Sequence, residues 1–318
     1  MAKGAPRGRL TMTASNPLRP PFPRLIDSSM RASFVSCPRQ FELQYLHHWR
    51  SPRPSIHLVA GGAFAKGIEV TRLSFYRDKL PPETSLGRGV RALILEYGDA
   101  EFDETQAKDC LTMCCALAEY FTIHELESDE ITPLMIEGSP CVEFSFALPL
   151  PLRHPETDDP ILYGGRFDML GLYNGALFAV DEKTTSQLGP SWIKNWTLRS
   201  QLTGYCWGAR EYGYPVAGAI IRGLSILKSG FGNAESIQYR PDWQIARWHS
   251  QLIRDISRMI SCWSEGYFDY NLDSSCSSYG GCAYLDICNS NDPQRWLGAD
   301  FIKREWHPLS HPKGIPSV

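Results

Sequence analysis

Two aspartates and a lysine, Asp168, Asp181 and Lys183, have the types and spacing of a divalent-metal site. Asn174-Gly175 lies midway between the aspartates. This dipeptide predicts a β-hairpin, because a type I′ turn needs positive φ at both central residues. Counting outward from the turn places Asp168 directly opposite Asp181, with Cβ atoms roughly 4.5–5.5 Å apart. Two carboxylates at that distance repel each other, and a hard cation such as Mg²⁺ would offset the repulsion by binding their oxygens.

The hairpin that would carry these residues spans Tyr163 to Ser186. Its pairing also sets Arg166 opposite Lys183, so the end far from the turn is charged and the end near the turn is apolar. Lys183 shares a face with Asp181 because strand side chains alternate. An alternative interpretation is an exposed strand end at which Arg166 and Lys183 only neutralise the aspartates, and spacing alone leaves both open.

Composition indicates a folded protein. The 318 residues allow one large domain or two small ones, and 43% hydrophobic residues with nine Trp argue against disorder. A net charge of −3 disfavours a protein that coats DNA but permits a local basic groove. We see no apolar run near the roughly 18 residues of a membrane span and no signal-peptide core, so we expect a soluble cytoplasmic protein without membrane contact.

The elements around the hairpin suggest an α/β fold with a mixed β-sheet flanked by helices. Helical spacing is found in 28–49 (broken at Pro38), 61–78, 86–127 (broken by the charged patch 99–104), 190–212 and 243–263. Alternation predicts a strand over 141–148, before a proline-rich loop over 149–160, and a doubly apolar run predicts a central strand over 216–227. Gln201 and Tyr205, at i and i+4, project from one face of their helix.

The cysteines form a second informative pattern. Cys276, Cys282 and Cys288 follow one another at six-residue steps, and Cys37 lies near the N-terminus. Four cysteines are the usual ligands of an iron–sulfur cluster, although a structural Cys₄ zinc site or free thiols remain alternatives. We interpret Cys110, Cys114 and Cys115 as core residues because no partner cysteines flank them.

In chain order, the motifs are Cys37-Pro38-Arg39, Asp168, Asp181-Glu182-Lys183, Gln201 with Tyr205, and the three C-terminal cysteines. Together they resemble the PD-(D/E)XK nuclease superfamily, and in particular its RecB-like branch. That branch includes CRISPR adaptation nucleases and phage recombination exonucleases. The resemblance implies a restriction-endonuclease-like core with helical additions. It implies Mg²⁺ or Mn²⁺ at Asp168, Asp181 and the backbone carbonyl of Glu182, with Lys183 positioning or activating the attacking water. Gln201 and Tyr205 would contact the substrate or orient the metal ligands. A [4Fe–4S] cluster bound by Cys37, Cys276, Cys282 and Cys288 would link the N-terminal and C-terminal parts of the chain.

The chain departs from the family pattern in two places. Many members carry a metal-binding His four residues after a Gly, and here Gly61 aligns Ala65 with that position. Glu69, one helical turn further, could coordinate the metal directly or through water, or could simply be solvated. The C-terminal cysteines are also further apart than the commoner Cys-x-x-Cys spacing.

We therefore predict a metal-dependent DNA nuclease, an exonuclease acting on DNA ends or single strands in repair, recombination or phage DNA processing. Two alternatives are a non-catalytic DNA-binding protein on a nuclease fold and a nuclease that acts only with a recombination or replication partner. We expect a flexible basic tail over 1–24, one nuclease domain over 25–307 with the cysteine cluster at 276–288, and a flexible tail over 308–318. The expected location is the cytoplasm of a bacterium or a phage-infected host, and the oligomeric state is left open.

Overall fold

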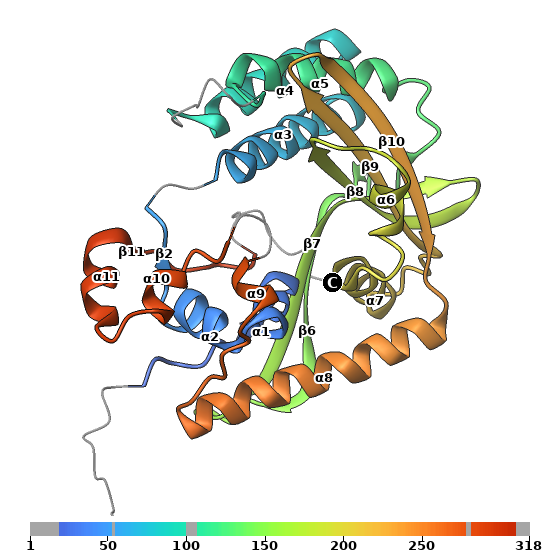
Figure 1. Ribbon diagram of the computed structural model, residues 1–318. Coiled ribbons are helices and arrows are strands. Elements are labelled where there is room, and N and C mark those ends of the chain that lie inside the picture. Colours follow the sequence, from blue (N-terminus) through green and yellow to red (C-terminus); the bar gives the residue numbers. More distant parts are fainter. Residues whose placement is uncertain (1–18, 53–54, 100–106, 278–280, 310–318) are drawn as a thin grey trace, which may run out of the picture.

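A computed structural model describes residues 19–52, 55–99, 107–277 and 281–309. Within these residues the main sheet has seven strands in the order β1-β7-β8-β9-β10, and β3 and β6 also pair with β7 (Figure 1). The strands are β1 (Leu25–Ile26), β3 (Thr132–Pro133), β6 (Val142–Arg153), β7 (Pro160–Tyr173), β8 (Ala176–Thr185), β9 (Gly218–Leu227) and β10 (Gly230–Tyr239). β1 with β7 and β8 with β9 run parallel, while the other pairs are antiparallel, so the predicted mixed sheet is confirmed.

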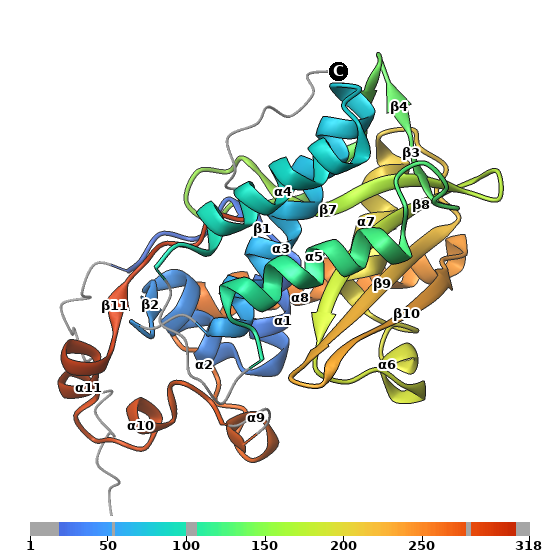
Figure 2. The same ribbon diagram turned by 90° about the horizontal axis from the view of Figure 1, so that it is seen from above.

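Helices cover both faces of the sheet (Figures 1 and 2). One face carries α3 (Ile56–Arg72), α4 (Pro82–Tyr97) and α5 (Cys110–Ile123), and the other carries α1 (Ser28–Ser36), α7 (Ser200–Glu211) and α8 (Asp242–Glu265). Phe64 and Leu117 belong to the core on the first side, while Phe146, Tyr163 and Leu252 belong to the core on the second. The α/β fold with flanking helices is therefore confirmed, and burial of an apolar layer on each face stabilises it.

The central hairpin forms as predicted near its turn. Asn174 and Gly175 both have positive φ, 48° and 77°, and the ladder runs outward from Tyr173↔Ala176 to Met169↔Val180. The predicted direct pairing of Asp168 with Asp181, and of Arg166 with Lys183, is wrong. From Asp181 onward β8 stays paired with β9 but leaves the β7 ladder, and on β7 Arg166 pairs with Ser145 of β6.

One strand is longer than predicted and another was not predicted, and in both cases the reason is the strand's position in the sheet. β6 continues to Arg153 across the expected loop over 149–160, since within the described chain it pairs only with β7 and its Pro149 and Pro151 need no second partner. β10 was not predicted, because polar residues and glycines interrupt its apolar positions and, among the described strands, it pairs with β9 alone at the edge of the sheet. An edge strand lacks the apolar signal that marks an interior strand.

Several helix boundaries also differ. α3 begins at Ile56 rather than Gly61, and it ends at Arg72 before a π-helical turn, η2 (Leu73–Arg77). Gly61 and Gly62 lie inside this helix because its apolar face packs into the core, and packing outweighs the weak helix propensity of glycine. The helix expected over 190–212 divides into α6 (Pro190–Lys194) and α7. The predicted breaks at Pro38 and between α4 and α5 are confirmed.

The C-terminal segment returns to the N-terminal helices. The remaining elements are α2 (Pro38–Phe41), η1 (Glu42–Leu46), β2 (Trp49–Arg50), β4 (Met135–Ile136), β5 (Ser139–Pro140), α9 (Ser274–Ser277), α10 (Leu285–Cys288), α11 (Pro293–Asp300) and β11 (Ile302–Lys303). β11 pairs with β2, and the Tyr284 hydroxyl donates to the Trp49 carbonyl at 2.7 Å. These contacts hold residues 284–303 against Trp49 and Arg50, which follow the N-terminal helices.

Most of the two predicted tails lies outside the described residues, since 1–18 and 310–318 are not among them. Their flexibility, and the single nuclease domain between them, stay predictions. None of the helices in the described ranges is long and apolar enough to cross a lipid bilayer.

Candidate active site

Strand alternation in β8 directs Asp181 and Lys183 to the same face of the sheet, toward α7. Asp181 is only 2% exposed, so the alternative of an exposed strand end does not describe it. Lys183 Nζ lies 2.5 Å from Asp181 Oδ2. Burial opposes the charge of Lys183, but Asp181 and Asp168 raise its pKa above the ordinary value. The lysine is therefore a cation held beside the aspartate.

Asp168 joins this pair from β7. Beyond Met169↔Val180 the two strands no longer form a ladder, and the Asp168 side chain takes the place of a ladder acceptor. Its Oδ2 accepts a hydrogen bond from the backbone N–H of Glu182 at 2.6 Å. The aspartates thus meet at the point where β7 and β8 separate, without facing each other across a ladder.

Glu182 turns its side chain to the opposite face, where α3 and α5 lie. Its Oε1 accepts hydrogen bonds from Arg72 Nη2 at 2.6 Å and from the Tyr120 hydroxyl at 3.0 Å. Burial alone would raise the pKa of Glu182, but Arg72 lowers it to about 2. The carboxylate of Glu182 is therefore a buried, ionised anchor, close enough to Asp168 for its negative charge to raise the pKa of that aspartate.

Glu69 lies on α3 and is buried rather than solvated, at 8% exposure. Lys66 Nζ lies 2.6 Å from its Oε2, one helical turn away. The negative charge of Glu69 also contributes to the raised pKa of Glu143, which places the two carboxyl groups in one electrostatic neighbourhood.

Glu143 was not among the predicted site residues. The pairs Val142↔Met169 and Phe144↔Phe167 bracket it, so it lies on β6 beside Asp168, with a φ of 57° that interrupts the ladder. Burial raises the pKa of Glu143 to about 7, against the opposing charge of Arg166 at 2.8 Å. The available signal was the one carboxylate in the predicted strand over 141–148, on the same face as Ser145.

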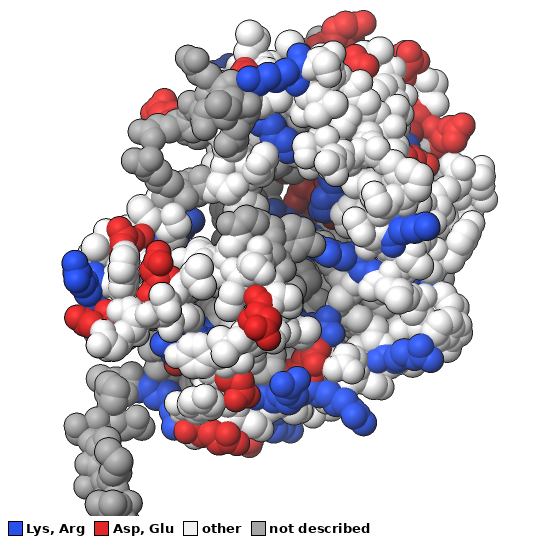
Figure 3. Space-filling model, viewed as in Figure 1, with Lys and Arg blue, Asp and Glu red and all other residues white. Residues whose placement is uncertain are grey.

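Negative charge on the two aspartates is unfavourable in this buried site. Burial, Glu182 and Asp181 together raise the pKa of Asp168 well above its ordinary value, and burial also raises that of Asp181. Carboxylates that repel in a low-dielectric site favour a bound proton or cation. On the face of the molecule seen in Figure 1, Figure 3 shows acidic and basic side chains together inside a hollow.

Gln201 and Tyr205 face this point from α7, and they contact each other as their spacing predicted. Gln201 Nε2 donates to the Tyr205 hydroxyl at 2.6 Å. The Tyr205 ring packs against Phe167, with centroids 5.3 Å apart. Burial and then the negative charges of Asp181 and Asp168 raise the pKa of Tyr205, so its hydroxyl stays protonated beside them.

The donor set suits a hard cation, although its side chains are engaged elsewhere. Among the described residues, none donates a hydrogen bond of normal geometry to Asp181 Oδ2, despite its proximity to Lys183. In the described part of the chain, no three His, Cys, Asp or Glu side chains converge in a metal-binding arrangement. Instead Asp181, Glu69 and Glu143 each contact a lysine or arginine. The oxygen ligands that Mg²⁺ prefers are therefore present, but binding requires these carboxylates to exchange partners.

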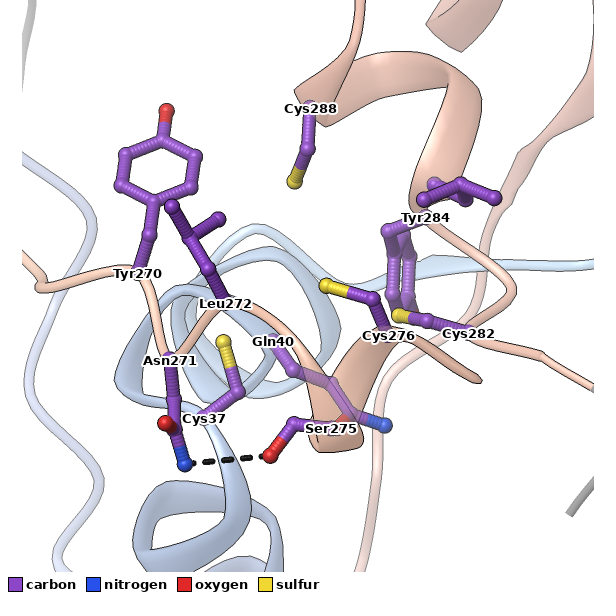
Figure 4. A pocket seen from close by; sticks show the side chains of 11 residues that line it. Cys37, Gln40, Tyr270, Asn271, Leu272, Ser275, Cys276, Cys282, Tyr284 and Cys288 are labelled. Atoms are coloured by element: carbon purple, nitrogen blue, oxygen red, sulfur yellow. Dashed lines mark hydrogen bonds between the residues drawn. The ribbon is translucent and has the colours of Figure 1, made fainter. Parts of the chain in front are cut away.

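The four predicted cluster cysteines, Cys37, Cys276, Cys282 and Cys288, line one small pocket between the start of α2 and the C-terminal segment (Figure 4). Burial raises the pKa of the Cys282 thiol, and the thiols of Cys37 and Cys276 raise it further. The tertiary structure thus brings together four residues that the sequence separates. They too do not form a preformed metal-binding group within the described residues, so the cluster stays a prediction.

Two hydrogen bonds fasten this segment beside Cys37. Asn271 Nδ2 and Ser275 Oγ both donate to the backbone carbonyl of Ser36, at 2.6 and 2.8 Å. The position of Cys276 relative to Cys37 is therefore fixed by polar contacts between the two ends of the chain.

The other cysteines behave mostly as predicted. Cys110 and Cys114 pack against the core under α4 and α5. Cys115 is exposed, so its assignment to the core is wrong. It lies on the outer side of α5, where the helix faces solvent.

Comparison with known proteins identifies the family. The profile of the PD-(D/E)XK nuclease superfamily matches residues 29–289. This chain therefore belongs to the PD-(D/E)XK nuclease superfamily, whose members are hydrolases that act on nucleic acids and generally use divalent metals such as Mg²⁺ or Mn²⁺. Among curated proteins, none matches the chain.

Solved structures are also similar to it, and two of them are compared with this chain in identity, coverage and TM-score. One is a "Putative exonuclease" from Eubacterium rectale, with 12% identity and a TM-score of 0.45, covering 80% of this chain and 88% of that one. The other, named SSO0001, has 11% identity and a TM-score of 0.31, covering 71% of this chain and 84% of that one.

Proposed function

We propose that this protein is a metal-dependent deoxyribonuclease, an exonuclease that hydrolyses phosphodiester bonds at DNA ends or in single strands during repair, recombination or phage DNA processing. The observation that carries the proposal is the meeting of Asp168, Asp181 and Lys183 at one buried point where β7 and β8 separate. Membership of the nuclease superfamily supports it.

Mg²⁺ or Mn²⁺ would be held by Asp168, Asp181 and the backbone carbonyl of Glu182, with Glu69 as a further ligand directly or through water. When bound, the ion lowers the pKa of a water ligand and neutralises charge on the phosphate. Lys183, a cation beside Asp181, orients that water and favours its deprotonation through its positive charge rather than by accepting the proton. The same charge stabilises the negative charge that develops on the phosphate oxygens. The buried Arg72–Glu182 pair keeps the backbone of β8 in place behind them.

Gln201 and Tyr205 would contact the substrate or orient the aspartates. The Gln201 amide donates to the Tyr205 hydroxyl, and that hydroxyl lies in the field of both aspartates. A protonated tyrosine next to two carboxylates can donate a hydrogen bond either to a carboxylate or to a phosphate oxygen.

The test is cleavage of end-labelled linear single- and double-stranded DNA with Mg²⁺ or Mn²⁺. We expect cleavage by the wild type and a loss of about 10²–10³-fold in Lys183→Ala, the range typical of removing one group that stabilises developing negative charge. Arg91→Ala, on the exposed surface of α4, is the control. The position of the released label gives the direction of digestion, and equal cleavage by Lys183→Ala and wild type would overturn the assignment of the site.

We further propose that Cys37, Cys276, Cys282 and Cys288 hold a [4Fe–4S] cluster, with structural Zn²⁺ as the alternative. Their shared pocket supports this proposal. Four protein ligands leave no open position, so either metal would be structural. Protein purified without oxygen should be brown, with iron and sulfide in comparable amounts, and Cys282→Ala should bleach it. Cys115→Ala, which alters an exposed thiol, should not. If the protein is colourless and contains zinc, the site holds structural Zn²⁺ and the proposed cluster is wrong.

One observation favours a second candidate function, a DNA-binding protein that is non-catalytic or acts only with a recombination or replication partner. Ala65 stands on α3 where many family members carry a metal-binding His. Under this alternative a correctly folded wild type binds DNA but does not cleave it with either metal. Ala65→His would then be the variant in which to look for restored cleavage.

A further inference from the structure

A groove runs between the start of α1 and the segment that joins α6 to α7, with a volume of about 550 Å³. Three cationic residues line it: Arg31, Lys194 and Arg199. Its other lining residues in the described chain are polar or apolar, and none is acidic. The groove is therefore positive on a chain whose net charge is −3.

The cations differ in how they are held. Arg31 is fixed, because its Nη2 lies 2.6 Å from Asp255 and its Nη1 contacts Ser200, so it ties α1 to α7. Lys194 and Arg199 are exposed, and within the described residues neither forms an ion pair with an acidic side chain. Two unpaired charges beside a fixed one leave positive charge available to a ligand.

The groove ends beside the candidate active site. Gln201 lines the groove and donates a hydrogen bond to the Tyr205 hydroxyl. That hydroxyl lies close enough to Asp168 and Asp181 for their negative charges to act on it. Arg199 in turn acts on Asp181 from the groove side. A chain of residues on α7 therefore connects the groove to the two aspartates.

We propose that this groove binds the sugar-phosphate backbone of a single DNA strand next to the scissile phosphate, an inference that rests on the proposed function. Lys194 and Arg199 would contact phosphates, because phosphate contacts by basic side chains supply most of the sequence-independent affinity for DNA. A volume of about 550 Å³ is that of a pocket for one small molecule, so it suits about a nucleotide of one strand rather than the width of a duplex. Leu198, 79% exposed at the same segment, offers apolar surface to a sugar or base.

The experiment measures binding separately from cleavage. The full chain is titrated onto fluorescently labelled single-stranded DNA, and onto the matching blunt duplex, with Ca²⁺ in place of Mg²⁺, at several salt concentrations. The variant is Lys194→Ala/Arg199→Ala, and the control is Arg91→Ala. We expect the double variant to bind the single strand at least about tenfold more weakly at low salt. Its slope of log K against log salt should fall by about 1.4, since each single-strand phosphate contact contributes about 0.7.

Four outcomes are informative. Wild-type affinity and salt slope in the double variant, with an unchanged melting temperature, would overturn the proposal. A loss confined to the duplex would also overturn it, because the groove would then serve double-stranded DNA. If the wild type binds single strands and loses them on substitution but never cleaves DNA, the groove stands and the proposed nuclease function fails. If wild type and double variant bind and cleave alike, the proposed groove fails and the proposed nuclease function stands.

Discussion

Arg72 and Glu182 form a buried ion pair, with Nη2 2.6 Å from Oε1, behind the segment of β8 that carries Asp181 and Lys183. The pair joins α3 to the sheet on the face away from the aspartates, and the Tyr120 hydroxyl donates to the same carboxylate oxygen. Since the side chains of adjacent residues in a strand point to opposite faces, anchoring Glu182 on one face fixes the direction of Asp181 on the other.

Removing one partner of this ion pair should strongly destabilise the protein. Glu182→Gln leaves the Arg72 charge buried without its carboxylate, and such a change costs about 3–5 kcal/mol. Urea unfolding measures the loss. The double variant Arg72→Met/Glu182→Gln should recover part of it, because no buried charge remains uncompensated.

Arg88→Met is the matched control for that series. It breaks an exposed pair in which Arg88 Nη1 lies 3.2 Å from Asp78, and exposed pairs contribute about 0–1 kcal/mol. Equal losses from Glu182→Gln and Arg88→Met would contradict the anchoring role.

Divalent metal should stabilise the wild type through Asp168. The raised pKa of Asp168, caused by burial and by neighbouring Glu182 and Asp181, indicates that its negative charge is unfavourable without a cation. We expect Mg²⁺ or Mn²⁺ to raise the melting temperature, because a ligand that binds only the folded state stabilises it. Asp168→Asn should be at least as stable as wild type in chelator and should show no such rise. A metal-dependent rise that persists in Asp168→Asn would remove this residue from the ligand set.

His124 should make the protein less stable in mild acid. Burial, together with the charges of Arg222 and Arg72 and against those of Asp129 and Glu182, lowers its pKa from 6.5 to about 4. Between these values the unfolded chain binds a proton that the folded chain does not, so stability falls as pH decreases from 6.5 to about 4.

Urea midpoints between pH 7 and pH 4 measure the effect of His124. His124→Phe keeps a ring beside Tyr120, whose centroid lies 4.8 Å away, and should flatten this part of the profile. His57→Gln, at an exposed position of α3, should leave it unchanged. An unaltered slope in His124→Phe would assign the acid sensitivity to other groups.

Two glycines of α4 should respond in opposite directions to alanine. A Cβ at Gly89 would lie 1.9 Å from Thr71 Oγ1 and 2.6 Å from the Gly67 carbonyl, so Gly89→Ala must push α3 and α4 apart. Overpacking of this kind costs about 1–3 kcal/mol. A Cβ at Gly87 meets no atom of the described residues within 4 Å, so Gly87→Ala should stabilise the exposed helix by about 0.5–1 kcal/mol. Urea midpoints that shift in the same direction would contradict the close contact between the two helices.

Features that depend on neighbours in the chain could be predicted from the sequence. Asn174-Gly175 determined the turn, because few other residues adopt positive φ at both positions. Strand alternation placed Asp181 and Lys183 on one face, and helical spacing brought Gln201 to Tyr205. Each follows from backbone periodicity, which acts over a few residues.

Only the tertiary structure decided which groups meet across long separations. Because the β7–β8 ladder ends at Met169↔Val180, Asp168 accepts a hydrogen bond from the Glu182 backbone, and the register of β6 on β7 places Glu143 beside it. The break between α6 and α7 opened the groove at Arg199. These outcomes depend on which strands compete for backbone hydrogen bonds and on how helices pack, and local sequence patterns do not record either.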